Sequence, residues 1–449
     1  MTIETPGTSE PSSAPPPDAA PDAAPATAPD AAPDPTVMAF APELLASTFP
    51  EYLQAWWTRI RGGESGALPI LAGLVIIVVV FQTQASSFLS AGNLVNLLVQ
   101  ATFFILLGTA EMFALLLSEI DLSVGFIAAV GGAIIAALVA APYNWPWWAA
   151  VIIGVLAMSA WGAFQGILIT RLHLPSFVVT LGGLLFLSGL LIYVFDVDSG
   201  STGGVLRVSN KVLYNLVNGN ITPVASWIIL VVVLAAFGLM SVAGAARRRR
   251  QGLSAPPISI TLLRVAVAAG AGVLLVIICN INRGALVPLR GVPWVIPFVL
   301  VVIAAWTVLL GRTRTGRYIY AIGASPEAAR RAGVNVARMR TLAFALSGFT
   351  AALAGLVYES RLGSISVGFD GGGYVLYAVA AAVIGGTSLF GGRGKAIHPL
   401  LGGIVLAAVY NGLGLLGITT AGTDMAFALV LLAAVTVDSL ARRRGTSAV

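Results

Sequence analysis

Long apolar runs that contain almost no charged residue recur along most of this chain, and no other feature constrains its fold as strongly. Residues 68–84, 94–117 and 147–170 are the first of them, and several more follow. Each approaches the roughly 20 residues that an α-helix needs to cross a bilayer. The strands of a transmembrane barrel would be about 10 residues long and would alternate in polarity, which these runs do not. With 10% charged residues over 449 positions and a mean hydropathy of +0.91, a soluble fold is excluded.

Hydropathy and loop polarity together predict an all-α polytopic membrane protein with about 12 transmembrane helices within residues 67–442. With the N-terminus inside, 20 of the 25 Lys and Arg residues fall on the cytoplasmic side, so both chain ends, including the tail 443–449, are predicted to be cytoplasmic. Basic span ends beside anionic lipid explain the net charge of +6, and no nucleic-acid partner is expected. The predicted span centres are Ile76, Ile105, Val130, Met158, Leu185, Val233, Leu274, Val302, Thr350, Ala381, Val405 and Leu431.

The segment before the first span divides into two parts. Residues 1–37 are rich in Pro and Ala and contain no apolar run, which predicts a disordered cytoplasmic tail. The segment begins acidic and Pro-rich, whereas a secretory signal begins with a basic region and an apolar stretch. Residues 38–66 are predicted to form an interfacial segment, with Trp56 and Trp57 at the level of the lipid headgroups.

Three carboxylates lie in or beside apolar sequence within residues 110–125, AEMFALLLSEIDLSVG. A charge in hydrocarbon is costly, so Glu111, Glu119 and Asp121 are candidates for function. Glu119 and Asp121 are equally compatible with a water-solvated turn between two spans, in which Asp121 and Ser123 cap the next helix. Glu111 lies deeper in the apolar run. We therefore consider Glu111, Asp121 and Ser123 as candidates for lining a translocation path.

The segment GGTSLFGGRG, residues 385–394, is dense in glycine inside an apolar run. Glycine permits a break in a helix, and non-helical backbone at membrane depth is tolerated where protein or a water-filled path surrounds it. Gly385, Gly386, Thr387 and Ser388 are therefore candidates for a discontinuous element beside the path, although tight helix packing explains small residues equally well. This segment and IDLSVG at 120–125 both follow spans that run in the same direction, which suggests a parallel internal repeat.

Residues of the kinds that bind nucleotides or metals do not form a recognisable site in this sequence. The stretch GGRGKA at 391–396 lacks two parts of a phosphate-binding loop, because Leu389 stands where the first Gly is needed and Ala396 stands where a hydroxyl is needed. One Cys and two distant His residues, His173 and His398, do not suggest a metal centre. We expect no cofactor, no metal and no catalytic residue in this chain, so any ATPase that drives it must be a separate subunit.

The longest polar interval in the second half of the chain is 312–340, which holds seven Arg residues. Within it, SPEAARRAG predicts a short amphipathic helix outside the bilayer. Ser325 can cap this helix, Pro326 suits its first position, Glu327 favours its positive end and Gly333 can close it. A rigid, solvent-facing helix joined to spans on both sides offers a surface on which another protein can act.

Glu327, Ala328, Ala329 and Gly333 form the pattern EAAxxxG, which resembles the cytoplasmic coupling loop of ABC-importer permeases. The flanking sequence from 315 to 418 resembles the monosaccharide branch of that family. The stretch LLSEIDLSVG resembles the family's IDLSVG signature, although Ser118 and Glu119 stand where the family usually has Gly-Gly. An extra pair of spans around 247–257, added to a family core of about ten, resembles the longer xylose-type permeases. The similarity extends over residues 67–442.

This resemblance implies a permease subunit of an ATP-driven importer that carries a monosaccharide, a pentose such as xylose, across the bacterial inner membrane. It implies a homodimer, an extracytoplasmic sugar-binding protein, and a cytoplasmic ATPase subunit that holds ATP and magnesium and docks at residues 325–333. One alternative is a stand-alone secondary transporter coupled to protons through Glu111 or Asp121. A structural membrane protein is a further alternative, which explains the hydropathy but not the glycine-dense segment.

Overall fold

The computed structural model describes residues 50, 51, 54, 57, 68–197, 204–251, 257–285 and 287–446. The predicted disordered tail, residues 1–37, lies outside the described residues. Of the predicted interfacial segment, only residues 50, 51, 54 and 57 are described, and all four are helical.

Twelve of the helices contain the predicted span centres, one centre in each. Among the described residues, eight helices are long and apolar enough to cross a membrane: α3, α5, α6, α8, α9, α10, α13 and α15. This confirms a polytopic helical membrane protein. The twelve helices are α2 (Leu68–Gln84), α3 (Ala91–Leu115), α4 (Val124–Val139), α5 (Trp147–Arg171), α6 (Ser176–Val197), α8 (Pro223–Arg250), α9 (Ile258–Asn280), α10 (Val295–Arg312), α13 (Val336–Leu362), α14 (Gly371–Ile384), α15 (Ile397–Leu415) and α16 (Thr420–Thr446).

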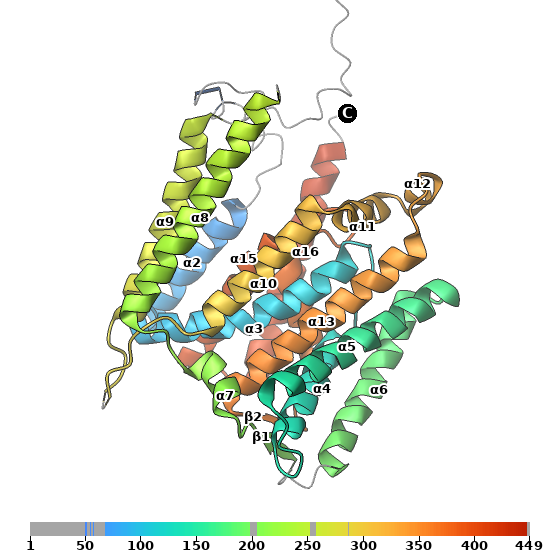
Figure 1. Cartoon of the computed structure of the whole chain (residues 1–449), viewed down its shortest axis with the longest axis horizontal. Helices are drawn as coiled ribbons and strands as arrows, with labels where there is room; N and C mark the ends of the chain where they lie inside the picture. The colour runs from blue at the N-terminus through green and yellow to red at the C-terminus, as the bar shows by residue number, and fades with distance from the viewer. Residues whose placement is uncertain are drawn as a thin grey trace, which may run out of the picture.

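The core of the protein is built around α3 and α13. In the most apolar stretch of α3, 94% of the residues are buried, and α13 packs against α3, α4 and α5. In the corresponding stretch of α8 no residue is buried, and α8 packs chiefly on α9. Figure 1 shows these two helices side by side at one edge of the protein. The pair of spans that the sequence marks as additional is therefore peripheral, and most of its apolar side chains are exposed or only partly buried.

Short elements lie at the two opposite ends of the helical bundle (Figure 1). At one end, β1 (Val205–Arg207) pairs antiparallel with β2 (Ser364–Ser366), beside α7 (Lys211–Asn218). At the other end lie α11 (Arg314–Ala324) and α12 (Pro326–Arg331), together with the end of α8 that carries four consecutive Arg residues. Basic residues thus gather at the α12 end, as the predicted topology requires of a cytoplasmic face.

Candidate functional site

Both termini of α12 are closed as the sequence predicts. The Ser325 hydroxyl accepts a hydrogen bond from the Ala328 amide at 3.2 Å, and Pro326 occupies the first turn. At the other end Gly333 has a φ of +81°, and its amide donates to the Arg330 carbonyl at 3.0 Å. Because these interactions are local, this helix forms where its own sequence dictates.

One face of α12 points into solvent. The side chain of Glu327 is 70% exposed and forms an ion pair with Arg330 at 3.2 Å, and Ala328 is exposed beside it. Ala329, in contrast, is only 4% exposed and belongs to the apolar core. Within the EAAxxxG pattern, Glu327 and Ala328 are therefore available to a partner protein, whereas Ala329 anchors α12 to the rest of the chain.

The preceding helix, α11, packs against two non-helical segments that are far apart in sequence. These are residues 116–123, between α3 and α4, and residues 385–396, between α14 and α15. A Cβ atom on Gly323 would lie 1.8 Å from the Leu116 carbonyl oxygen and 2.5 Å from the Gly392 nitrogen, so only glycine permits this approach. The Gly392 amide in turn donates to the Leu116 carbonyl at 3.0 Å. We call this meeting of α11 with the two segments the junction.

Ser118 adopts a left-handed backbone conformation at the junction. Its φ is +64°, a value that favours glycine. The Ser118 hydroxyl donates to the Phe390 carbonyl at 2.8 Å and so ties the two non-helical segments together. The residue that stands in place of the first Gly before IDLSVG therefore has a conformation suited to glycine and makes a hydrogen bond across the junction.

Asp121 and Ser123 belong to a buried polar network at the start of α4. Asp121 is fully buried, and its Oδ1 accepts from the Ser123 hydroxyl at 2.6 Å and from the Ser123 amide at 3.0 Å. Gln165 of α5 donates to the Ser123 hydroxyl at 2.9 Å. The alternative in which water solvates Asp121 is wrong, because this side chain is fully buried. The expected cap is present in part: Asp121 bonds the backbone there, while the Ser123 side chain makes no capping bond.

Glu111 lies on α3 directly under this turn. It is fully buried, and its Oε1 accepts a hydrogen bond from the Asp121 amide at 3.2 Å, so it helps to fix the backbone of the turn. Its Oε2 has no hydrogen-bond partner in the part of the chain that the structure describes. Glu359 of α13 is also fully buried, and both of its oxygens lack a partner among the same residues. The sequence reading overlooked Glu359, although a carboxylate within an apolar run is the signal that identified Glu111.

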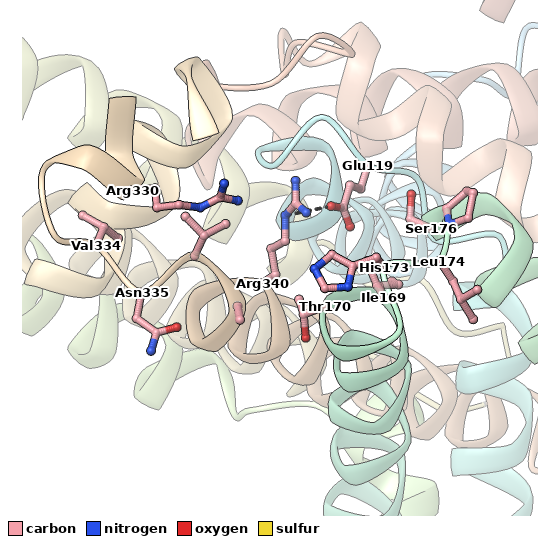
Figure 2. Close-up of a pocket in the computed structure, with 13 residues that line it drawn as sticks. Glu119, Ile169, Thr170, His173, Leu174, Ser176, Arg330, Val334, Asn335 and Arg340 are labelled. Atoms are coloured by element: carbon pink, nitrogen blue, oxygen red, sulfur yellow. Dashed lines mark ion pairs between the residues drawn. The ribbon is translucent and has the colours of Figure 1, made fainter. Parts of the chain in front are cut away.

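An ion pair joins the start of α13 to the turn at 116–123. Arg340 Nε lies 3.1 Å from Glu119 Oε1, and both residues line a pocket of about 500 Å³ (Figure 2). The Glu119 side chain is 8% exposed and that of Arg340 27%. Burial raises the pKa of Glu119, and the positive charge of Arg340 offsets part of that rise.

The other walls of this pocket come from α12 and the residues around the start of α13, and from the facing ends of α5 and α6 with the link between them. Arg330 and Asn335 lie on one side, and His173 and Ser176 on the other (Figure 2). The sequence reading noted His173 only as an unlikely metal ligand and missed this link. Its signal is the short polar interruption RLHLPS between two apolar runs. The pocket therefore opens beside α12, at the end of the protein where basic residues gather.

Residues 385–396 form an irregular segment after α14 in which buried and exposed residues are mixed. Gly386 has a φ of +107°, and Thr387 and Ser388 are each 2% exposed. A Cβ atom on Gly385 would lie 1.9 Å from the His398 carbonyl oxygen, so glycine is required here for close packing. Because α14 has 14 residues, it is about 21 Å long, shorter than the roughly 30 Å of the hydrocarbon core. The discontinuous element beside a translocation path stays a prediction, and close packing accounts for the glycine at 385.

Residues 93–436 match a family of membrane proteins whose model is described as branched-chain amino acid transport system / permease component. Three similar proteins come from Escherichia coli strain K12. The xylose transport system permease protein XylH is 33% identical over 383 residues, which are 84% of this chain and 92% of that protein. The D-allose transport system permease protein AlsC is 30% identical over 368 residues, 82% and 90% of the two chains. The ribose import permease protein RbsC is 29% identical over 369 residues, 82% and 92%. No solved structure matches this chain.

Proposed function

Because this chain belongs to the family of transport-system permeases whose model covers residues 93–436, we propose that it is the membrane-spanning subunit of an ATP-driven importer of a monosaccharide. The family description mentions branched-chain amino acids, but the xylose, allose and ribose permeases resemble this chain over more than four fifths of its length. A pentose such as xylose is the substrate that these similarities favour.

The observation that carries the coupling proposal is α12, a capped helix whose Glu327 side chain is 70% exposed at the end rich in basic residues. Such a helix presents a rigid surface without needing a partner to fold it. We propose that a cytoplasmic ATPase subunit, which holds ATP and magnesium, docks on Glu327 and Ala328, with Ser325 and Gly333 fixing the two ends of the docking helix.

Three connections can carry a displacement of α12 into the membrane-spanning helices. The first is covalent, because α13 starts five residues after α12 ends and is 27 residues long. The second is the ion pair between Arg340 and Glu119, which reaches the turn between α3 and α4. The third is the backbone contact at Gly323, through which α11 reaches both non-helical segments of the junction. ATP-driven closure of the ATPases would thus move several helices as one rigid body.

The proposed arrangement comprises about 12 transmembrane helices with both chain termini in the cytoplasm. Basic residues at the α12 end support this orientation. Two copies of the chain would form a homodimer in the bacterial inner membrane, surrounded by lipid, and a sugar-binding protein would deliver substrate at the opposite end, beside β1 and β2. Asp121, Ser123, Thr387 and Ser388 are buried around the junction, where we propose that they shape the inner part of the translocation path.

Uptake by proteoliposomes tests the proposal. Labelled xylose, ribose and leucine are supplied to vesicles that contain this chain alone, or this chain with its ATPase and binding protein, with and without internal ATP. The expected result is sugar uptake only with all components and ATP. Uptake of leucine instead of sugar would contradict the substrate class. Uptake by the chain alone that stops when the proton gradient is collapsed, and that is lost in Glu111→Gln, would replace the proposal with proton-coupled transport.

A further inference from the structure

Eight aromatic side chains form one connected cluster in the half of the protein that lies away from α12. Neighbouring ring centroids are 4.5 to 6.5 Å apart. The rings come from α3, α13, α14, α15, α16 and the segment before α14. They are Phe103, Phe104, Tyr358, Phe369, Tyr374, Tyr377, Tyr410 and Phe427.

Polar and charged groups border these rings. The Tyr377 hydroxyl donates to Asp424 Oδ1, and the other carboxylate oxygen of Asp424 has no hydrogen-bond partner among the described residues. Arg361 makes one long hydrogen bond, 3.4 Å, to the Asn96 side chain. Asp424 and Asn96 are exposed, and Tyr410 is 37% exposed. Five of the eight rings are buried, so only the rings of Tyr358, Tyr374 and Tyr410 are partly or fully exposed. We call these three tyrosines, together with Asp424, Arg361 and Asn96, the aromatic face.

The aromatic face is unsuited to contact with lipid tails. A carboxylate and a guanidinium that face hydrocarbon are costly, so such groups on membrane-spanning helices face water or protein. Phe186 of α6 is an exposed ring without charged neighbours along its helix, and it serves for comparison. It is 56% exposed and stacks on Trp161 at 4.8 Å, on a helix whose stretch from Ser176 to Tyr193 carries no charge. The charged groups therefore indicate that the aromatic face meets water or protein and not lipid tails.

We propose that the aromatic face binds the transported monosaccharide on its way through the membrane, an inference that rests on the proposed function. The C–H side of a sugar ring is apolar and packs on an aromatic ring, while its hydroxyls both donate and accept hydrogen bonds. Asp424 accepts from a pair of sugar hydroxyls, and Arg361 and Asn96 donate to others. Tyr410 supplies both an exposed ring and a hydroxyl that makes no hydrogen bond within the described residues.

The first test compares sugar uptake by vesicles that contain the complete complex. Asp424→Asn keeps an acceptor for Tyr377 but removes the charge, and Tyr410→Phe removes only a hydroxyl. We expect uptake at low sugar concentration to fall at least about tenfold in Asp424→Asn and several-fold in Tyr410→Phe, as expected for the loss of hydrogen bonds to the substrate. Phe186→Leu is the control and should transport as the unaltered complex does.

The outcomes separate this inference from the proposed function. Uptake by the unaltered complex that both aromatic-face variants retain would overturn the inference alone. Loss of uptake accompanied by dissociation into monomers, measured by size-exclusion chromatography with light scattering, would also overturn it, because a second copy would then cover the face. An unaltered complex that takes up no monosaccharide would overturn both.

A second test measures access of water to the aromatic face. The native chain has one cysteine, Cys279, and it is fully buried, so background labelling is low. Tyr410→Cys and, as control, Phe186→Cys are treated with a charged maleimide in the complete complex. We expect labelling only at position 410, slowed by added xylose. A site at 410 that stays unlabelled, or whose labelling xylose does not change, would contradict the proposal.

Discussion

Replacement of Arg340 by Met tests whether its ion pair with Glu119 holds the start of α13 to the turn between α3 and α4. The change keeps the unbranched stem of the side chain, removes the guanidinium, and leaves a carboxylate that is 8% exposed without its counter-ion. Removing one partner of a fully buried pair costs about 3–5 kcal/mol. Because Arg340 is 27% exposed and reaches the pocket in Figure 2, we expect a smaller loss of unfolding free energy, about 2–3 kcal/mol at neutral pH.

The pH dependence of this loss follows from the pKa of Glu119. Burial raises that pKa more than Arg340 lowers it, so loss of Arg340 raises it further. A carboxyl group whose pKa is higher in the folded state than in the unfolded state destabilises the fold once the pH has risen through the folded pKa. Below the unfolded pKa of about 4.3 the group is protonated in both states, and this destabilisation is absent. Arg340→Met should therefore regain most of its lost stability as the pH is lowered toward that value.

Thermal unfolding in lipid nanodiscs, followed by tryptophan fluorescence at pH 5 and pH 8, measures both effects. Arg338→Met is the control, since Arg338 is exposed and only its backbone amide makes a hydrogen bond; it should change stability by less than about 0.5 kcal/mol. Adding Glu119→Gln to Arg340→Met should restore most of the loss, because an amide needs no counter-ion. Equal stability of the two Met variants at pH 8 would refute the reasoning.

Substitutions at three further positions probe α12 and the junction. Gly323→Val places a Cβ atom 1.8 Å from the Leu116 carbonyl oxygen, so α11 must move. We expect a stability loss of about 1–3 kcal/mol and ATP hydrolysis that no longer responds to the sugar-binding protein. An unchanged response would contradict a role for the backbone contact at Gly323 in coupling. Ser118→Gly relieves a left-handed strain of about 1 kcal/mol but also removes a hydrogen bond of similar worth, so its melting temperature should stay nearly constant. Ser118→Val keeps the strain and removes the hydrogen bond, so its unfolding free energy should fall by about 2 kcal/mol. Glu327→Arg breaks only an exposed ion pair worth at most about 1 kcal/mol, so the fold should persist while co-purification with the ATPase is abolished; retained co-purification would argue against docking on α12.

Several features of this protein could be predicted from its sequence because they depend on local chemistry. An apolar run in a bilayer must satisfy its backbone hydrogen bonds internally, so each run predicts a helix wherever it occurs. The ends of α12 were likewise predictable, because Ser325, Pro326 and Gly333 act on backbone groups within a few residues. The resemblance to sugar-importer permeases could also be found in the sequence alone, and the similarity to XylH over 84% of this chain confirms it.

Other features depend on contacts between segments that are distant in sequence. The glycine-dense segment 385–396 could be identified from composition, but its contact with Leu116 and Gly323 could not. The burial of Asp121 follows from the way α5 and α13 pack over the turn, which is why the solvated alternative could not be rejected from sequence. The inward orientation of Ala329 has the same origin, because burial on a six-residue helix depends on its neighbours.

The sequence by itself determined which segments form apolar helices and where α12 begins and ends. Only the tertiary structure decided that α12, α11 and the two non-helical segments meet at one end, and that Tyr410, Asp424 and Arg361 share one face at the other. The physical reason is the separation along the chain over which each interaction acts. Hydrogen bonding along a helix and the cost of charge in lipid act on each segment separately, whereas a contact such as that between Ser118 and Phe390 joins positions that are 272 residues apart and exists only once the helices have packed.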